Sequence, residues 1–295
     1  MASNVGWELY RSFLGVLKEG SLSGAARALG ITQPTAGRHI AALEAALGVA
    51  LFTRSQVGLL PTEIALALRS YAEAMESTAA SLERTATSHG EGVRGVVRVS
   101  ASDVIGVEVL PPIVTRLRDR HPDLKIELVL TDRVQDLLRL EADIAVRMVR
   151  PDQGQLVARR IGQIELGLHA RKEYLSRHGE PRNLGELSGH WIIGYDQPSA
   201  FVRKAEKLLR SYSRDTFSLR TDSNLAQLAL IRSGAGIGVC QVPIARRDDA
   251  LIRVLAKHFS LQLETWVTMH EDLRNSPRCR ATFDALVAGL QQYIT

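Results

Sequence analysis

A short run of polar side chains near the amino terminus has the residue types that read DNA. Gln33, Thr35 and Arg38 lie within six residues of one expected helix, and His39 follows them. Glutamine and threonine can hydrogen-bond base edges or phosphates, and arginine can donate two hydrogen bonds to guanine or clamp a phosphate. Arg54 lies further along, where a backbone or minor-groove contact is expected. Each side chain alone could belong to a solvated helix face, which for His39 is the favoured alternative, but as a set they predict DNA contact.

Three amphipathic helices are needed to hold this set in place. Apolar residues at helical spacing predict helices that end at Gly20, Gly30 and Gly48. Ser21 and Thr32 have the side-chain oxygens that cap helix N-termini. Two helices joined by a short turn that contains glycine form a helix-turn-helix, whose second helix enters the major groove. Two β-prone runs around residues 55–58 predict a hairpin wing after the third helix.

Residues 63–92 form a second kind of segment, with a heptad seam. The seam consists of Ile64, Leu68, Tyr71, Met75, Thr78, Leu82 and Thr85. Such a seam packs either against the core of its own chain or against a second helix, and both alternatives stay open here. The stretch 88–92, Ser-His-Gly-Glu-Gly, breaks the pattern and is expected to be a hinge.

Beyond Val93 the chain alternates between β-branched apolar runs and helical stretches. Strands are expected over residues 96–99, 126–130, 144–146, 166–169, 191–195, 217–220, 237–239 and 263–269. Helices are expected over residues 107–120, 134–140, 200–211, 224–233 and 278–293. This alternation predicts βαβ units, a mostly parallel sheet and room for two α/β lobes.

Polar residues that follow the expected strands are candidates for a ligand site. They are Ser100, Ser102, Thr131, Arg147, Tyr195, Thr221 and Ser223. Strand carboxyl ends and helix N-termini are where α/β sheets bind ligands. Arg147 follows a buried-strand pattern and needs an anionic partner, either a ligand carboxylate or an internal residue such as Asp143. Ser102 and Ser223 could instead cap helices, and Thr131 could be an ordinary strand-end residue.

Other patterns do not predict a catalytic, redox or metal site. Gly234-x-Gly236-x-Gly238 resembles a phosphate loop, but it follows an expected helix and leads into a strand, the reverse of a dinucleotide-binding motif. Cys240 and Cys279 are distant in sequence and form no CxxC pair, which favours core positions over redox sensing. The histidines are scattered without metal-ligand spacing. No acid–base set or activated nucleophile is recognisable, so neither an enzyme nor a cofactor is expected.

A run of fifty residues near the amino terminus has a family pattern. Residues 13–62 read FLGVLKEGSLSGAARALGITQPTAGRHIAALEAALGVALFTRSQVGLLPT, and the most telling positions are Gly20-Ser21, Ala25-Ala26, Leu29, Gln33-Pro34, Arg38, Ile40, Leu43-Glu44, Leu47-Gly48 and Leu51-Phe52. This run resembles the winged helix-turn-helix of the LysR-type transcriptional regulators. The later segments LPPIVTRLRDRHPDLKIEL, ADIAVR and SGAGIGV are similar to parts of that family's periplasmic-binding-protein-like sensing domain.

The resemblance implies an α/β protein in three parts. These are a winged helix-turn-helix DNA-binding domain over 1–62, a linker or dimerisation helix with a hinge over 63–92, and a two-lobed effector-binding domain over 93–295. Lobe 1 is expected at about 93–163 and 268–295, and lobe 2 at about 164–267, with a ligand cleft between them. The predicted DNA-binding residues are Ser21, Ser23, Thr32, Gln33, Pro34, Thr35, Arg38, His39, Arg54 and Thr62.

Two positions depart from the family pattern. Gly37 stands in the third helix where relatives often have serine, and a glycine in a helix interior costs roughly 0.5–1 kcal/mol relative to alanine. The wing lacks a second basic residue near Gln56. Because residues 1–62 carry only five basic against three acidic residues, we expect DNA affinity to require paired subunits on two half-sites.

Composition agrees with a globular chain. Of 295 residues, 45% are hydrophobic and 23% charged, which is ordinary for a folded protein. No run approaches the roughly 18–20 apolar residues of a membrane helix, and no signal-peptide pattern opens the sequence, so a reduced cytoplasm is expected. The net charge of +5 divides into +2 over 1–62, −3 over 63–92 and +6 over 93–295, so the surplus lies mainly in the expected sensing domain.

These observations predict a sequence-specific DNA-binding transcriptional regulator whose operator binding or activation responds to a small, anionic metabolite. The expected partners are double-stranded promoter DNA, an effector such as a carboxylate, further copies of the chain as a homodimer or homotetramer, and RNA polymerase as a candidate; no membrane partner is expected. The alternatives are a ligand-independent DNA-binding protein and a small-molecule-binding module without a regulatory response.

Overall fold

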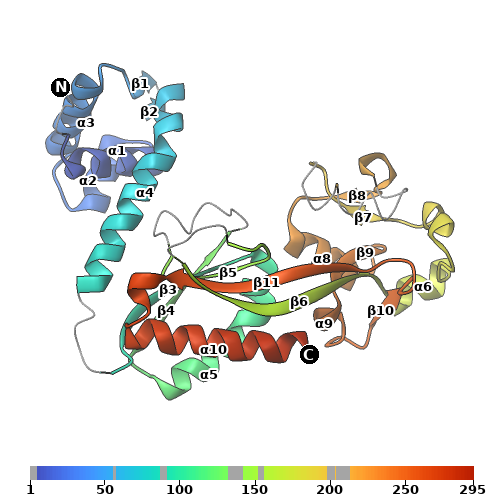
Figure 1. Ribbon diagram of the computed structural model, residues 1–295. Coiled ribbons are helices and arrows are strands. Elements are labelled where there is room, and N and C mark those ends of the chain that lie inside the picture. Colours follow the sequence, from blue (N-terminus) through green and yellow to red (C-terminus); the bar gives the residue numbers. More distant parts are fainter. Residues whose placement is uncertain are drawn as a thin grey trace. The chain divides into compact units, whose positions relative to one another are not determined.

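The computed structural model describes residues 5–55, 58–86, 92–131, 142–151, 156–197, 203 and 213–295. These residues form two compact units, one up to residue 86 and one from residue 92 onward (Figure 1). The expected helices over 134–140 and 200–211 (residue 203 apart), the hinge over 88–91 and Gln56 of the wing lie outside the described residues.

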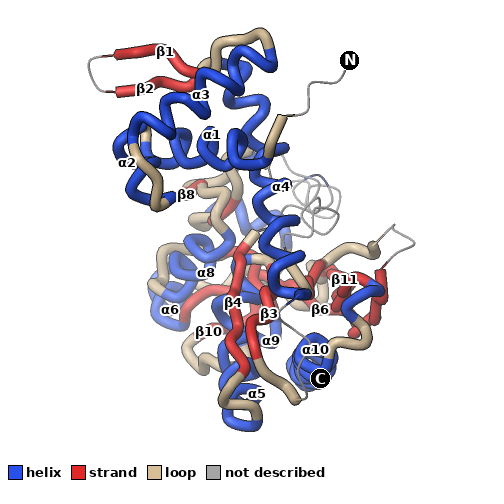
Figure 2. The backbone as a smooth tube through the Cα atoms, turned by 90° about the vertical axis from the view of Figure 1, so that its left-hand side faces the viewer, coloured by secondary structure: helices blue, strands red, loops and turns tan. Residues whose placement is uncertain are grey.

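The first unit contains the predicted helices and wing. They are α1 (Trp7–Glu19), α2 (Leu22–Leu29), α3 (Gln33–Leu47), β1 (Phe52–Ser55) and β2 (Gly58–Pro61), and the two strands form an antiparallel hairpin (Figure 2). Gly20, Gly30 and Gly48 end the three helices with φ of 68°, 67° and 70°, a left-handed conformation that glycine adopts without a Cβ penalty. The predicted helix ends and the hairpin are therefore confirmed.

The wing is fastened to α3 by a buried apolar contact and a carboxylate. Phe13, Leu43 and Leu51 are almost fully buried in the core of this unit. Glu44 Oε1 accepts hydrogen bonds from the backbone N–H groups of Leu51 and Phe52 at 2.7 and 3.2 Å. One side chain of α3 thus satisfies two backbone donors at the entry to β1, which sets the wing next to that helix.

Helix α4 (Glu63–Ala86) belongs to the first unit, and the face that it buries is offset from most of the predicted seam. Ala65 and Ala72 are buried against the core, and Leu68 packs beside them. Four seam residues are exposed by 45%, 66%, 40% and 68%, in the order Ile64, Tyr71, Met75 and Leu82. The seam is thus mostly not core of its own unit, and the side chain of Thr85 lies outside the described residues.

The second unit is built on a seven-stranded mixed sheet. Its strands are β3 (Gly95–Ala101), β4 (Leu124–Leu130), β5 (Ile144–Arg147), β6 (Leu156–Arg171), β9 (Gly238–Gln241), β10 (Leu251–Val254) and β11 (Leu261–His270). Their order is β10-β6-β11-β5-β3-β4, and β9 also pairs with β6. Among the described strands of this sheet, the pairings of β3 with β4 and β5 are parallel.

The prediction of a mostly parallel sheet is wrong. The pairings of β6 with β9, β10 and β11, and of β11 with β5, are all antiparallel. Strand β6 is 16 residues long, but the sequence pattern had placed only 166–169 in a strand. Its first half contains two adjacent arginines, a glycine and a glutamine, so it lacks the apolar run that a buried parallel strand shows.

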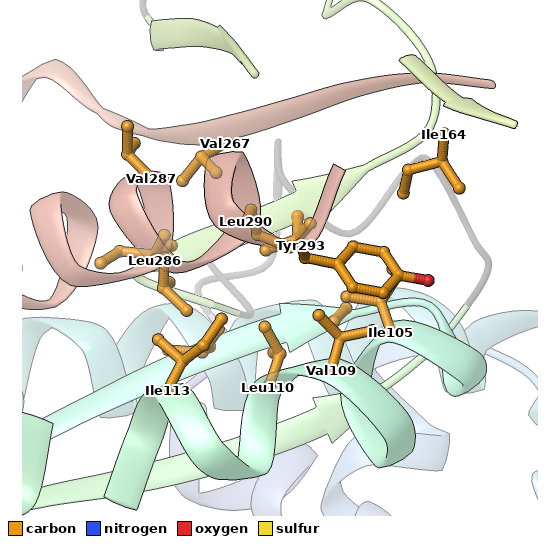
Figure 3. Close-up of a cluster of buried hydrophobic side chains, with 14 of the residues drawn as sticks. Ile105, Val109, Leu110, Ile113, Ile164, Val267, Leu286, Val287, Leu290 and Tyr293 are labelled. Atoms are coloured by element: carbon orange, nitrogen blue, oxygen red, sulfur yellow. The ribbon is translucent and has the colours of Figure 1, made fainter. Parts of the chain in front are cut away.

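Two helices cover one part of this sheet, which we call lobe 1 (β3, β4, β5, α5 and α10). Helix α5 (Leu110–Arg120) follows a π-helical turn, η1 (Ile105–Val109), and α10 (Pro277–Ile294) packs on it. Figure 3 shows Leu286, Leu290 and Tyr293 of α10 beside Ile113 and Val109. The expected helices over 107–120 and 278–293 are confirmed.

The other part, lobe 2, has shorter elements. They are α6 (Lys172–His178), β7 (Ile193–Gly194), β8 (Leu219–Arg220), α8 (Asn224–Arg232), α9 (Val242–Ala245) and β10, with 3-10 turns at Leu184–Gly189 and Arg214–Thr216. Tyr174, Phe217 and Phe259 are buried in its own core. The strands expected over 191–195 and 217–220 shrink to two residues each, while α6 and β10 had no sequence prediction. Strands β6 and β11 run through both lobes.

Candidate functional site

The first turn of α3 presents polar groups to solvent. Thr32, Gln33, Pro34 and Arg38 are exposed, and Thr35 is half-buried. Thr32 Oγ1 caps the helix by accepting from the Thr35 backbone N–H, and it lies 2.8 Å from Thr35 Oγ1. Arg38 Nη2 in turn donates to Thr35 Oγ1 at 3.3 Å. This chain of hydrogen bonds holds the guanidinium along the exposed side of the turn, as a DNA-reading helix requires.

His39 has an internal partner. Its Nδ1 lies 2.7 Å from Oγ of Ser12, which is 1% exposed in α1. The ring is half-buried and joins α3 to α1. A DNA contact through this nitrogen would have to replace that hydrogen bond, and the alternative of a solvated helix face does not describe this half-buried ring.

The hydroxyls of Ser21 and Thr62 also act within the fold. Each accepts a hydrogen bond from the backbone N–H three residues ahead and caps the helix that follows, α2 and α4 respectively. Ser23 is half-buried in α2, and Arg54 is exposed on β1. The structure therefore groups Thr32, Gln33, Pro34, Thr35 and Arg38 in one turn, with Arg54 on the wing.

The second unit contains a cavity of about 480 Å³ that both lobes line. Its described lining residues are Ser102, Val104, Met148, Leu166, Tyr195, Gln197, Asp222, Asn224, Leu228, Val239, Cys240, Gln241, Ile244 and Leu263. They come from the carboxyl ends of β3, β5 and β7 and from the start of α8, together with β6, β9, α9 and β11. Volume and position match the clefts in which α/β sheets bind small molecules.

Two of the seven predicted effector residues, Ser102 and Tyr195, line this cavity. Ser223 Oγ accepts from the Ala226 backbone N–H and caps α8, the alternative role predicted for it. Thr221 Oγ1 accepts from the backbone N–H of Ser223 at 3.2 Å, and Thr131 continues β4 without reaching the cavity lining.

The remaining two, Ser100 and Arg147, are bound to each other. Arg147 is 5% exposed and donates through Nη2 to Ser100 Oγ at 2.7 Å and through Nη1 to the Val146 carbonyl at 3.1 Å. Asp143, the internal alternative, accepts from the Arg98 backbone N–H at 2.8 Å. Neither Ser100 nor Arg147 is among the residues that line the cavity.

The sequence reasoning missed Asn224, Asp222 and Gln241. Asn224 accepts a 2.5 Å hydrogen bond from Tyr195 Oη, and Asp222 Oδ1 accepts from two backbone N–H groups of the loop after β7. Asn224 directly follows the predicted helix cap Ser223, so its position at the start of a helix could have marked it as a candidate. Gln241 is the last residue of β9, and only its tertiary contacts mark it.

A buried histidine, His169, lies next to Cys240 of the cavity lining. His169 is 1% exposed, with its Nδ1 2.9 Å from the Gly167 carbonyl and 3.3 Å from Cys240 Sγ. Burial lowers the pKa of His169 to about 4 and raises the pKa of Cys240 to about 12. Both groups are therefore uncharged at neutral pH, and the thiol lacks the thiolate character that redox chemistry needs.

An ion pair joins η1, which leads into α5 of lobe 1, to α8 of lobe 2. The Glu108 carboxylate of η1 accepts two hydrogen bonds from Arg232 at the end of α8, at 2.6 and 2.8 Å. These hydrogen bonds hold the pKa of the Glu108 carboxyl below its ordinary value. Arg247 donates to the Glu108 carbonyl at 2.9 Å, a group that has no α-helical donor because Pro112 lacks an N–H. Glu108 thus binds two arginines of lobe 2.

Family models match both units of the chain. Residues 7–66 match the bacterial regulatory helix-turn-helix proteins of the lysR family, and residues 90–291 match the LysR substrate binding domain. The chain belongs to the LysR family. The resemblance at residues 13–62 and the fold it implied, a winged helix-turn-helix followed by a two-lobed α/β domain, are confirmed.

The relatives that this LysR-family chain resembles are named transcriptional regulators and not enzymes. The HTH-type transcriptional regulator CrgA of Neisseria meningitidis serogroup C (strain 8013) is 30% identical over 188 residues, which cover 64% of this chain and 63% of CrgA. The match thus spans less than two thirds of that relative. The activator TtdR of Escherichia coli (strain UTI89 / UPEC) is 26% identical and covers 94% of this chain and 91% of TtdR.

Solved structures show the same fold. The structure of CrgA from Neisseria meningitidis has a TM-score of 0.59 at 26% identity, covering 96% of this LysR-family chain and 98% of CrgA. Full-length CbnR in complex with its target DNA has a TM-score of 0.66 at 19% identity, covering 98% of this chain and 99% of CbnR, a likeness of fold alone. In the described ranges, no group of three or more His, Cys, Asp or Glu could hold a metal ion. No helix among them combines the length and apolarity of a membrane span.

Proposed function

We propose that this LysR-family protein is a sequence-specific DNA-binding transcriptional regulator whose operator binding or promoter activation responds to a small molecule. The observation that carries this proposal is the first turn of α3, where exposed Gln33 and Arg38 stand on a winged helix-turn-helix. The partners we propose are double-stranded promoter DNA, further copies of the chain and, if it activates, RNA polymerase.

The small-molecule site we propose is the cavity that Ser102 and Tyr195 line. The sequence-based expectation of an anionic metabolite depended on Arg147. Since that guanidinium donates to Ser100 and Val146 and Arg147 does not line the cavity, an anion held by Arg147 would need a place outside the cavity lining. A carboxylate in the cavity would instead meet Ser102, which precedes the helical turn at residues 103–104.

Selection of binding sequences from random duplex DNA with the full-length protein tests the regulatory half of the proposal. We expect one enriched motif with two half-sites. Arg38→Ala should then lower affinity for that motif by about tenfold or more, because a well-placed arginine contact to a base is worth ~1–3 kcal/mol. The control is Arg120→Ala, which removes an exposed arginine of the second unit and should leave affinity unchanged.

The salt dependence of binding distinguishes the two roles of Arg38. If Arg38 contacts a phosphate, Arg38→Ala weakens binding to all sequences, and the slope of log binding constant against log salt concentration decreases in magnitude by about one. If Arg38 contacts a base, the loss of affinity is confined to the selected motif. Full-length protein that enriches no motif would contradict the proposed function. DNA binding that no metabolite alters would favour the ligand-independent alternative.

A further inference from the structure

Gln241 lies at the end of β9, and the oxygen of its side-chain amide accepts a hydrogen bond. The residue is 7% exposed and lines the cavity. Tyr293 of α10 donates a hydrogen bond from Oη to Gln241 Oε1 at 2.5 Å. Among the described residues, Nε2 of Gln241 has no hydrogen-bond partner. Nε2 is not one of the fully buried side-chain atoms without a partner, so it opens to the cavity and can donate to a ligand that offers an acceptor.

Tyr293 sets the orientation of that amide. It is buried, and its ring lies under the guanidinium of Arg247, 5.0 Å from the ring centroid. Burial raises the pKa of Tyr293 well above its ordinary value, so the hydroxyl keeps its proton and can donate. Because Oε1 accepts from this hydroxyl, the NH₂ group of Gln241 is the part of the amide left for a ligand.

The other walls of the cavity are mainly apolar. Val104, Met148, Leu166, Leu228, Val239, Ile244 and Leu263 supply aliphatic or thioether surface. No lysine or arginine is among the described lining residues, and Asp222 places an acidic residue on the rim. An ionised carboxylate taken from water into such surroundings without a cation would lose more solvation than the Gln241 amide and the Ser102 hydroxyl restore. The cavity therefore favours an uncharged ligand.

We propose that the cavity takes an uncharged, largely apolar molecule whose hydrogen-bond acceptor binds Gln241 Nε2. Gln241 is then the specificity-determining residue of the site. This inference rests on the proposed function only where it implies that ligand binding regulates transcription. The binding itself depends on the cavity and its amide.

Calorimetric titration of the full-length protein with four probes tests the ligand class. The probes are 2-acetylnaphthalene, which is uncharged with one acceptor, naphthalene, which lacks the acceptor, 2-naphthoate and succinate. We expect 2-acetylnaphthalene to bind about tenfold tighter than naphthalene, and succinate not to bind. Tighter binding of 2-naphthoate or succinate than of 2-acetylnaphthalene, or no binding of either uncharged ring compound, would overturn the proposal.

Gln241→Met tests the residue. Methionine keeps the length of the side chain but has no N–H group, so the preference for 2-acetylnaphthalene over naphthalene should disappear while naphthalene still binds. Retained naphthalene binding shows that the cavity has folded. Gln197→Met makes the same change at the exposed glutamine of the same cavity and should keep the tenfold preference. A preference that survives Gln241→Met refutes the role of Gln241.

A parallel measurement separates this inference from the proposed function. Binding of the full-length protein to its selected DNA motif is followed by fluorescence anisotropy with and without 2-acetylnaphthalene. Motif binding without any ring-compound binding would overturn the ligand inference alone. Ring-compound binding by a protein that selects no motif would overturn the regulatory function and leave the cavity chemistry supported.

Discussion

His169 is the residue whose surroundings most strongly alter its proton affinity. It lies in β6, almost fully buried, and its Nδ1 is occupied by the Gly167 carbonyl and the Cys240 thiol. Burial disfavours the imidazolium, and Arg253 adds a like charge nearby. The ring is thus neutral in the folded protein at a pH where it is partly protonated in the unfolded chain.

This difference predicts a loss of stability in mild acid. The pKa of His169 falls from 6.5 to about 4, so between these values the unfolded state binds more protons and the free energy of unfolding decreases as pH falls. We expect His169 to account for a decrease of about 2 kcal/mol between pH 7.5 and pH 5 in denaturant unfolding of the second unit. His169→Asn retains a polar nitrogen near Nδ1 but does not titrate in this range.

The variant should therefore be less stable at neutral pH and less sensitive to acid than the wild type. His258→Gln, at an exposed histidine, serves as the control and should retain the wild-type loss. An identical acid dependence in His169→Asn and wild type would show that His169 does not carry the effect.

At the scale of elements, a glycine inside a helix leaves free space in α3 but allows close helix packing in α10. Gly37 lies inside α3, where an added Cβ would be 3.7 Å from Leu22 Cδ1, an ordinary van der Waals distance. Gly289 lies inside α10, where an added Cβ would be 2.5 Å from Cγ1 and Cδ1 of Ile113. The first glycine leaves space on the helix that we propose to contact DNA, whereas the second allows α10 to approach α5.

Alanine at the two positions should change stability in opposite directions. Gly37→Ala gains helix propensity without a clash and is expected to stabilise the first unit by about 0.5–1 kcal/mol. Gly289→Ala gains the same propensity but forces Ile113 to move, and overpacking of this kind costs ~1–3 kcal/mol. Thermal unfolding of the two variants measures both changes. A destabilising Gly37→Ala would mean that α3 needs glycine at this position.

At the scale of the whole molecule, we propose that two copies of the chain pair through the exposed seam of α4. Ile64, Tyr71, Met75 and Leu82 lie on one side of this helix, and the faces that pack inward carry Ala65 and Ala72. Apolar side chains at heptad spacing are suited to a second copy of the same helix. With only two net positive charges over residues 1–62, paired reading domains would supply the affinity that one lacks.

Charge on the seam should therefore separate the subunits. We expect Tyr71→Asp combined with Leu82→Asp to raise the dissociation constant of the homodimer by about 100-fold, because the aspartates would be buried at the contact. Analytical ultracentrifugation of the full-length protein measures this change, and DNA affinity should fall with it. Leu66→Asp is the matched control, since Leu66 is 53% exposed on the opposite side of the same helix. Equal effects of the control and the double variant would contradict a seam interface.

The local sequence was sufficient to predict helix α3 and its ends. Ser21, Thr32 and the three glycines that end the helices interact with backbone groups only a few residues away. Interactions of this kind can be predicted from a short stretch of sequence. His39 differs, because its partner Ser12 is 27 residues away on another helix. A polar face in the sequence gives no sign of such a contact.

The sequence by itself determined the family, the winged helix-turn-helix, the heptad seam and the α/β character of the second unit, since these depend on residue types at short spacing. Only the tertiary structure decided that the sheet is mostly antiparallel, that Arg147 pairs with Ser100, and that Gln241 and Asn224 line the cavity. Strand direction and side-chain partners follow from how β6 and β11 run through both lobes and bring distant residues together. Long-range packing of that kind leaves no periodic signal in the chain.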